Sequence, residues 1–371
     1  MTDRGSPPPT TSSRKKGPTG THLLTGSSVF RIAAPSRITT LRVRGTGHQV
    51  TLPPTPTFTL GREPTAGDPP APHADVQIPS RRKAVSLIHA TFEWRGDRLW
   101  CRDERSTNGT FADDQPQHDW FVITSGMRLD VGDTKLLALD WRLTALQGPL
   151  RWCLGLDAAL AVDRALGLVQ QEGPLLLTGP RGCDQEWLAR RIHDASGRRE
   201  HPFAAFTSKL PRGADALLAD ARWGTVFVDL ATVGKVSKAF AAKLFGGDTS
   251  PLRLRPIISA TSHVASQRAF EDLAQTQMLA LPPLAHRRDE VPRLFDLLMA
   301  EQGSRARVRD LGAPRVERLI EHDWPSNLDE LREAERRIRA LLEGGNKTQA
   351  AKRVGSSRQA LDKFLRRIFH D

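Results

Sequence analysis

An apolar strand that turns through glycines into a helix constrains the fold of this 371-residue chain more than any other feature. The run Leu175–Leu177 leads into "TGPRGCDQEWLARRIH", in which two glycines precede a helical pattern of Leu, Ala and Ile. Backbone N–H groups in such a turn, at the start of a helix, form a cradle for phosphate. In working ATP sites a lysine of this turn reaches the β- and γ-phosphates, and here Gln185 stands in its place. The stretch predicts an α/β domain but argues against ATP hydrolysis.

Composition sets broad limits on the class of protein. A hydrophobic content of 39% over this length is enough for two or three domains with cores of their own. No apolar run is long enough to cross a bilayer and the N-terminus lacks an apolar secretory segment, so we expect a cytoplasmic protein. The three cysteines are widely spaced, which predicts neither disulfides nor a metal site. The net charge of +12 favours a polyanionic partner such as DNA, although an arginine-rich genome would give the same charge.

Changes in residue pattern divide the chain into five segments. Ser, Thr, Pro and basic residues dominate the first, which predicts a disordered basic arm. Short alternating runs follow, and "HATFEW" and "RLWCRD", joined at Gly96, predict a β-hairpin. Helical periodicity begins near Leu154 and continues to the end, interrupted by strand-like runs. The predicted segments are the arm (1–37), a β-rich domain (38–143), an α/β domain (152–285), a helical subdomain (286–343) and a C-terminal helical unit (344–371).

Three short motifs follow one another in the β-rich domain: "GRE" (61–63), "SLIH" (86–89) and "DERSTNGTF" (103–111). Together they resemble the forkhead-associated (FHA) domain, a β-sandwich whose loops bind phosphothreonine peptides. The planar donor fork of an arginine matches phosphate geometry, and a serine hydroxyl supplies a further donor. The resemblance implies a phosphopeptide site formed by Arg62, Ser86, Thr107 and Asn108, with Gly61 and His89 in structural roles.

Two questions stay open for these loops. Asn-Gly pairs favour tight turns, so the alternative is that "NGT" is only a hairpin turn. Leu87 stands where the family often has a basic or polar residue, and the basic run 81–83 would then supply charge. The phosphothreonine would belong to a Ser/Thr kinase or its substrate, or to the chain's own arm, in which the candidates are Thr10, Thr11, Thr21 and Thr25.

The central region, from about Leu154 to Leu342, resembles the AAA+ domain of sigma-54-dependent transcription activators. The segments "LARRIHDASGRREHPFAAF", "GTVFVDL", "LPPLAHRRDEVPRL" and "WPSNLDEL" follow that family's first helix, Walker B strand and lid in order. The resemblance implies an α/β nucleotide-binding fold covered by a helical lid.

The positions that carry ATP chemistry in that family are changed here. Asp184 replaces a glycine, and Gln185 replaces the lysine, whose loss costs about 1.5–3 kcal/mol, or a factor of about 10 to 100 in affinity. Leu230 follows Asp229 where the catalytic glutamate belongs. The family's arginines and its first sensor asparagine are also replaced, and the residues at those positions are Phe270, Thr276, Asp329 and Ser262. We therefore expect no enzymatic activity and no required cofactor.

Residual binding of ATP and magnesium is the alternative for this site. The backbone of the glycine turn still offers N–H donors, and Asp229 would still meet a magnesium ion. The degenerate nucleotide site then comprises Gly179, Gly182, Asp184, Gln185 and Asp229. The interval 207–222 carries no GAFTGA element, which engages sigma-54 in the family, so we expect no activation of sigma-54 polymerase by the usual route.

The C-terminal stretch "GNKTQAAKRVGSSRQALDKFLRRI" predicts two helices around a glycine turn. Ser356 and Gln359 fit a capping box at the start of the second helix, and Ala360 begins its apolar face. The unit resembles the Fis-type helix-turn-helix of the same activators, which implies DNA binding near the start of the second helix. The candidate DNA contacts are Lys352, Ser357, Arg358, Gln359, Lys363 and Arg366. The alternative is a solvated basic helix pair packed on the lid.

The sequence therefore predicts a multidomain protein: an FHA-like β-sandwich, an α/β AAA+ P-loop-type domain with a helical lid, and an all-α helix-turn-helix. The expected function is DNA-binding transcriptional regulation in response to a phosphothreonine signal, with an inactive ATPase domain. Helix-turn-helix proteins usually pair on two half-sites, so we expect a homo-oligomer that does not contact membranes. Two alternatives remain: a phosphoprotein-binding adaptor with vestigial DNA binding, and a regulator that senses nucleotide without hydrolysing it.

Overall fold

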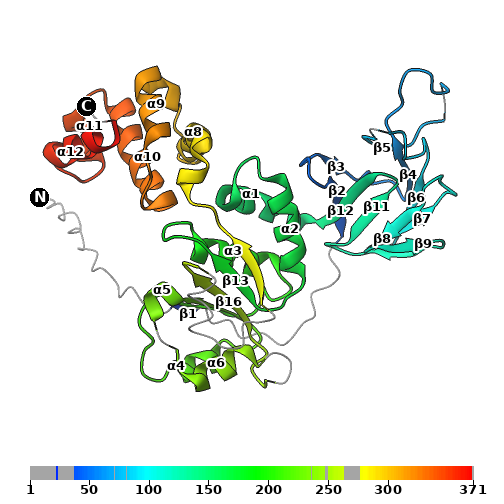
Figure 1. The fold of residues 1–371 in the computed structure, drawn as a ribbon, viewed down its shortest axis with the longest axis horizontal. Helices are drawn as coiled ribbons and strands as arrows, with labels where there is room; N and C mark the ends of the chain where they lie inside the picture. The colour runs from blue at the N-terminus through cyan, green and yellow to red at the C-terminus, as the bar shows by residue number, and fades with distance from the viewer. Residues whose placement is uncertain are drawn as a thin grey trace, which may run out of the picture.

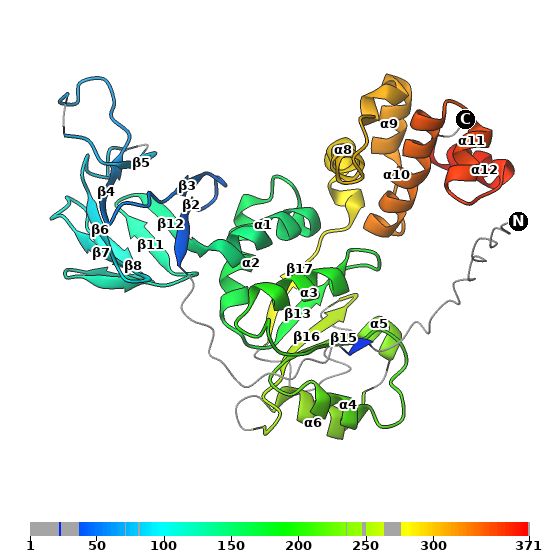
Figure 2. The same ribbon diagram turned by 180° about the vertical axis from the view of Figure 1, so that it is seen from behind.

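The computed structural model describes residues 22–23, 37–70, 72–80, 82–234, 236–246, 250–262 and 276–369. Figures 1 and 2 show a β-sandwich, a central α/β part and a C-terminal group of helices, which confirms the predicted fold class. Within the described ranges, no helix combines the length and the apolar character needed to cross a membrane. Phe270 and the four candidate threonines of the arm lie outside the described residues.

The β-sandwich consists of two sheets with the strand orders β10-β7-β6-β4-β5 and β3-β2-β12-β11-β8-β9. Alternate side chains of both sheets point inward, and Leu41, Phe58, Phe92 and Leu129 are almost completely buried between them. The predicted hairpin is confirmed as β6 paired with β7. The strands are β2 (Ile38–Val43), β3 (Gln49–Thr51), β4 (Thr57–Arg62), β5 (Val76–Ile78), β6 (Ala90–Arg95), β7 (Arg98–Asp103), β8 (Thr110–Ala112), β9 (Gln115–Gln117), β10 (Phe121–Ile123), β11 (Arg128–Val131) and β12 (Thr134–Asp140).

The central part is a parallel sheet with helices on both faces. Its order is β14-β15-β16-β13-β17, and β1 pairs antiparallel with β14 at the edge. Leu175 and Leu177 pack with α1, α2 and α3 on one face, and the intervening Leu176 packs with α4 and α6 on the other. The elements are β1 (His22–Leu23), α1 (Trp141–Leu154), α2 (Ala159–Gln170), β13 (Leu175–Thr178), α3 (Gln185–Ala195), β14 (Phe203–Phe206), α4 (Ala214–Asp220), β15 (Thr225–Asp229), α5 (Leu230–Val233), α6 (Lys238–Phe245), β16 (Arg255–Ala260) and β17 (Gln277–Ala280).

Two predicted boundaries were wrong. The helical part begins at Trp141 rather than near Leu154, because Asp140 ends β12 and caps α1 by accepting a hydrogen bond from Leu143 N (2.9 Å). Residues 141–151 therefore belong to the α/β core and not to the sandwich or to a linker. The predicted disordered arm also contributes β1, whose backbone pairs with the sheet edge.

The C-terminal helices share one core. Trp324, Leu328 and Ile338 of the predicted lid are buried in the same cluster as Leu361 and Ile368 of the predicted helix-turn-helix. The two predicted segments 286–343 and 344–371 are thus packed together around one core. The elements are η3 (Leu284–His286), η4 (Arg288–Glu290), α8 (Val291–Glu301), η5 (Val308–Leu311), α9 (Ala313–Glu321), α10 (Asn327–Gly344), α11 (Lys347–Arg353) and α12 (Arg358–Phe369).

Candidate functional site

The fold brings the three FHA-like motifs together at one end of the sandwich. Gly61 lies against the loop between β5 and β6, where an added Cβ would be 1.9 Å from the carbonyl oxygen of Leu87, so only glycine fits. The backbone N–H of Arg62 donates to the carbonyl of Ser86 (3.0 Å). Asn108, in the loop between β7 and β8, donates its side-chain amide to the carbonyl of Ala84 (2.7 Å). The predicted phosphopeptide residues therefore come from the end of β4 and from two neighbouring loops.

His89 links two of these loops from inside the domain. Its imidazole is completely buried, Nδ1 accepts from the N–H of Ser86 (3.1 Å) and Nε2 lies 3.1 Å from the carbonyl oxygen of Gly109. Burial lowers the pKa of His89, so the neutral ring can accept at Nδ1 and donate at Nε2. The side chain braces the loops and does not face solvent.

The loop that carries Thr107 and Asn108 is not a hairpin turn. It connects β7 and β8, which belong to different sheets, and Asn108 is not among the residues with positive φ. Asp103 organises the loop by accepting from the N–H and hydroxyl of Ser106 (2.9 and 2.7 Å) and from the hydroxyl of Thr110 (2.8 Å). Asp103 was missed as a site residue, although its place at the start of the "DERSTNGTF" motif was visible. Thr107 and Asn108 are exposed on the outer side of this loop.

Arg62 does not point freely into solvent. Its two terminal nitrogens donate to the carboxylate of Asp68 (2.5 and 2.6 Å), and the side chains of both residues are only 9% exposed. Nothing in the sequence pattern marked Asp68, which lies in the loop between β4 and β5.

In the altered phosphate loop, the substituted residues contact the protein itself. Gln185 begins α3, and its side-chain amide donates to the carbonyls of Gly179 (3.2 Å) and Pro180 (2.8 Å), inside the turn. Asp184 adopts φ 62°, a left-handed conformation that glycine favours and that aspartate tolerates. Asp184 therefore adopts the backbone conformation that the family's glycine would favour, and Gln185 closes the turn from inside.

The carboxylate of Asp184 joins the phosphate loop to the lid and to α1. It accepts two hydrogen bonds from the guanidinium of Arg332 on α10 (both 2.5 Å) and one from the indole Nε1 of Trp152 on α1 (2.7 Å). Arg332 also lies over the ring of Trp152, with its Cζ 5.4 Å from the ring centroid. Together these three residues form a contact that we call the lid latch.

Backbone contacts hold the start of α10 against the same loop. The N–H of Leu328 donates to the carbonyl of Gly182 (2.9 Å), and the side-chain amide of Asn327 donates to the carbonyl of Arg181 (2.8 Å). Gly182 has φ 80°, and a Cβ there would lie 2.1 Å from the carbonyl oxygen of Ser326. The lid is therefore closed directly on the glycine turn.

Asp229, the expected magnesium ligand, is engaged by its own neighbourhood. Its carboxylate accepts from the N–H of Ala231 (3.1 Å) and from the hydroxyls of Thr232 and Ser259 (both 2.9 Å). Leu230 is the first residue of α5. Burial and the nearby Asp184 carboxylate raise the pKa of Asp329. No cluster of potential metal ligands is present in the part of the chain that the structure describes.

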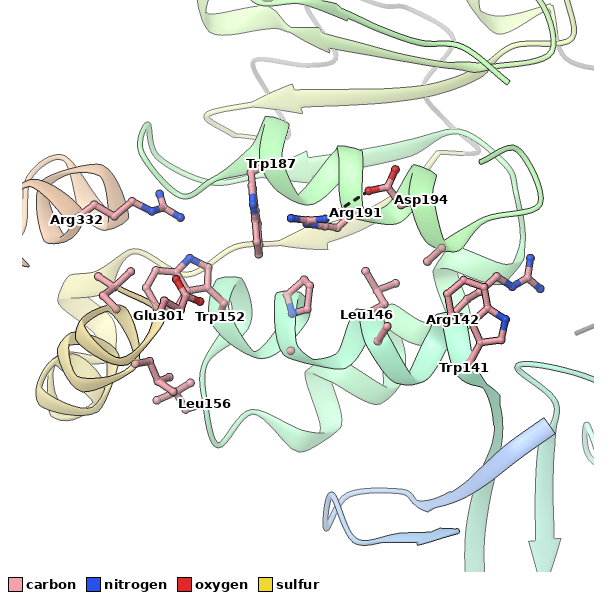
Figure 3. A pocket seen from close by; sticks show the side chains of 16 residues that line it. Trp141, Arg142, Leu146, Trp152, Leu156, Trp187, Arg191, Asp194, Glu301 and Arg332 are labelled. Carbon is pink, nitrogen blue, oxygen red and sulfur yellow. Dashed lines mark ion pairs between the residues drawn. The ribbon is translucent and has the colours of Figure 1, made fainter. Parts of the chain in front are cut away.

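Next to the lid latch, α1 and α3 enclose a groove of about 600 Å³ (Figure 3). Trp152 and Trp187 form its walls towards the lid, and Trp141 and Arg142 line its far end. The groove was not predicted because α1 was not. Gly148 leaves open space on the groove side of α1, since a Cβ added there would meet no atom outside its own helix within 4 Å.

The C-terminal unit contains the predicted two helices, with Gly355 (φ 66°) between them. The predicted cap was wrong by one residue: Ser357, rather than Ser356, accepts at its hydroxyl from the N–H of Ala360 (3.1 Å). Ala360 is exposed, and the apolar face begins at Leu361. All six candidate DNA contacts are exposed on α11, α12 and the residue before α12.

Comparisons with known proteins agree with this division. The FHA domain model matches residues 58–132. The acetoin catabolism regulatory protein of Cupriavidus necator is 31% identical over 258 residues, which are 56% of this chain and 38% of that protein. The nitrogen assimilation regulatory protein NtrX of Azorhizobium caulinodans is 30% identical over 229 residues, half of each chain. The putative uric acid sigma-54-dependent transcriptional regulator UacR of Escherichia coli is 30% identical over 205 residues, 42% of this chain and 33% of that protein.

This chain spans half or less of the length of each of these relatives. The aligned stretches are far longer than the FHA match, so the similarity to these regulators extends well beyond the sandwich. The protein combines an FHA domain with a region homologous to the sigma-54-dependent family of transcriptional regulators.

Proposed function

We propose that this protein is a DNA-binding transcriptional regulator that reads phosphothreonine through its FHA domain and does not hydrolyse ATP. The observation that carries the proposal is the altered phosphate loop, in which Asp184 and Gln185 bond to protein groups. The short interval 207–222, without a GAFTGA element, further supports regulation by a route other than direct remodelling of sigma-54 polymerase.

The charges around the loop disfavour a polyphosphate. A cavity of about 390 Å³ lies beside the glycine turn, and Arg181 is the one cationic side chain among its described lining residues. Four carboxylates line the same cavity: Asp184, Glu186, Asp229 and Asp329. Carboxylates that line the same cavity repel phosphate oxygens, and the lysine that would offset them is absent.

The lid latch supplies what nucleotide supplies in many ATPases, namely a connection between the α/β part and the lid. Asp184 provides the anion, Arg332 provides the cation on the lid, and Trp152 provides a further donor. The charge-assisted pair is bidentate, the strong form of such contacts. These contacts would hold the lid against the α/β part, consistent with a scaffold role for this domain.

Titration with a fluorescent ATP analogue, with and without magnesium, tests the loss of nucleotide chemistry. We expect no saturable binding by the wild-type chain at millimolar nucleotide. The double variant Asp184→Gly, Gln185→Lys restores the two family residues and should gain measurable affinity, because the lysine alone contributes about a factor of 10 to 100. Micromolar binding by the wild type would overturn the proposal and favour a nucleotide-sensing regulator.

DNA binding is supported by the exposed basic residues at the start of α12, where helix-turn-helix proteins contact base edges. Replacing both Arg358 and Lys363 by alanine should weaken retention of the full chain on genomic DNA fragments and reduce its salt dependence. Arg318→Ala is the matched control, since this arginine is exposed on α9 and outside the unit. Unchanged retention would favour the adaptor with vestigial DNA binding.

Phosphothreonine reading is supported by the neighbouring positions of Arg62, at the end of β4, and of Ser86 and Asn108, in two loops that contact each other. The full chain should retain a pool of peptides with a fixed phosphothreonine and randomised flanks, and should not retain the unphosphorylated pool. Ser86→Ala should weaken this retention, because its hydroxyl is a donor for the phosphate. Equal retention of the two pools would overturn this part of the proposal.

A further inference from the structure

We propose that Asp68 is a built-in competitor for phosphothreonine, whose carboxylate occupies the phosphate-binding group of Arg62 until a phosphopeptide displaces it. The inference rests on the proposed phosphothreonine reading. In this proposal Asp68, from a loop that carries none of the family motifs, sets the affinity of the phosphothreonine site.

The carboxylate of Asp68 sits in a set of donors suited to a phosphate. Arg62 binds it with both terminal nitrogens (2.5 and 2.6 Å), and Lys83 Nζ lies 3.5 Å from Oδ1. The backbone N–H and the hydroxyl of Thr65 both donate to Oδ2 (2.7 and 2.8 Å). A guanidinium fork, an ammonium, a hydroxyl and a backbone N–H are the groups that proteins use to bind phosphate oxygens. Hydrogen bonds from Arg62 and Thr65 hold the pKa of Asp68 well below its usual range, so the carboxylate is charged at neutral pH.

A local turn holds Asp68 in this position. The N–H of Asp68 donates to the carbonyl of Thr65 (3.0 Å), which closes a turn that includes Gly67 at φ 93°. The anion therefore returns to Arg62 only six residues along the chain, at a high effective concentration. Because the side chain of Arg62 is only 9% exposed, an incoming phosphate reaches its guanidinium only by displacing Asp68.

The position of Arg62 beside Ser86 makes this displacement a direct competition. Arg62 N donates to the carbonyl of Ser86, so a phosphate held by the Ser86 hydroxyl would lie next to the Arg62 side chain. With Asp68 in place, the local cluster of Arg62, Lys83 and Asp68 has a formal charge of +1, and without the carboxylate it would be +2. A phosphate dianion would therefore bind more tightly once the carboxylate is neutralised.

Asp68→Asn tests the competition because it removes the charge and keeps the shape. In the full chain we expect the Kd for the phosphothreonine peptide pool to fall by about a factor of 10 to 100, the range that one charge-assisted contact represents. Asp75→Asn is the matched control. It removes a carboxylate at the other end of the same loop, where Asp75 accepts from the N–H and hydroxyl of Thr59 (both 2.8 Å) and does not bond to Arg62. Its Kd should change by less than a factor of about 3.

The outcomes separate this inference from the proposed function. If the wild type binds the pool and Asp68→Asn binds it equally or more weakly, the carboxylate only holds the loop and the competition is refuted. If neither protein distinguishes phosphorylated from unphosphorylated peptides, phosphothreonine reading itself fails, and the competition with it. Arg62→Ala should lose phosphate-dependent binding in both backgrounds, with thermal unfolding used to verify that each variant is folded.

Discussion

The lid latch between Asp184 and Arg332 leads to a quantitative prediction. Arg332→Met keeps the stem of the side chain over Trp152 but leaves the Asp184 carboxylate, which is 6% exposed, without its cation. Removing one partner of a fully buried pair costs about 3–5 kcal/mol. Since 37% of the Arg332 side chain is exposed, solvent screens part of this interaction, and we expect a cost of about 2 kcal/mol.

Hydrogen exchange measures this cost where it acts. The N–H of Leu328 donates to the carbonyl of Gly182 across the junction of lid and phosphate loop, so its exchange reports opening of the lid. A loss of about 2 kcal/mol makes exchange about 30 times faster. Arg318→Met, which removes an exposed pair with Glu321 on α9, should leave this amide within a factor of about 2 of the wild type.

A double-mutant cycle with Asp184→Asn completes the test. If the two residues stabilise the closed lid through each other, the effects of Arg332→Met and Asp184→Asn on exchange should be clearly less than multiplicative. Wild-type exchange rates in Arg332→Met, or fully multiplicative effects, would refute the reasoning that the pair replaces nucleotide as the connection.

Three further predictions concern stability. Burial lowers the pKa of His193 to about 4, so between pH 6.5 and 4 the unfolded chain binds a proton that the folded chain excludes. Urea unfolding at pH 5 should therefore show about 2 kcal/mol less stability than at pH 7. His193→Gln should flatten this pH dependence of stability. Gly61→Ala places a Cβ against the carbonyl of Leu87 and should destabilise the sandwich by at least about 2 kcal/mol in thermal unfolding. An unchanged thermal stability of this variant would contradict the close packing at Gly61. Arg42→Met leaves the Asp163 carboxylate, which is 2% exposed, without its cation between the sandwich and α2, and should lower the stability of this junction by about 3 kcal/mol. Limited proteolysis should then cut near residue 140 faster than in the wild type. Equal cleavage rates would contradict a coupling role for the pair.

The sequence predicted elements whose signal is local. The strands around the phosphate loop and the β6–β7 hairpin follow from apolar runs and turn residues, and the structure contains them as expected. Helix α1 was missed because Gly148 and Pro149 lower helix propensity by about 1 and 3 kcal/mol, a cost that packing of Leu143, Leu146 and Leu150 against the α/β core outweighs. Packing of the apolar face of α1 thus outweighed the low helix propensity of its sequence.

The candidate sites follow the same rule. The order of the motifs predicted that Gly61, Arg62 and His89 lie close together, at the end of β4 and in the loop before β6. The partners of those residues were not predictable: Asp68 meets Arg62 only because a particular turn folds back, and Arg332 meets Asp184 across 148 positions of chain. Pairwise charge contacts of this kind depend on the folded path and leave no periodic trace in the sequence.

Asp140 is shared by two domains, since it is the last residue of the final sandwich strand and the cap of the first helix of the α/β part. It is completely buried, and Arg142 donates to it from the first turn of that helix (2.9 Å). There is consequently no tether here whose length or flexibility could be tuned. A phosphoprotein bound by the sandwich would therefore be held in a fixed orientation relative to the α/β part. The shape of the bound partner, and not only its affinity, would then determine which other parts of the molecule it contacts.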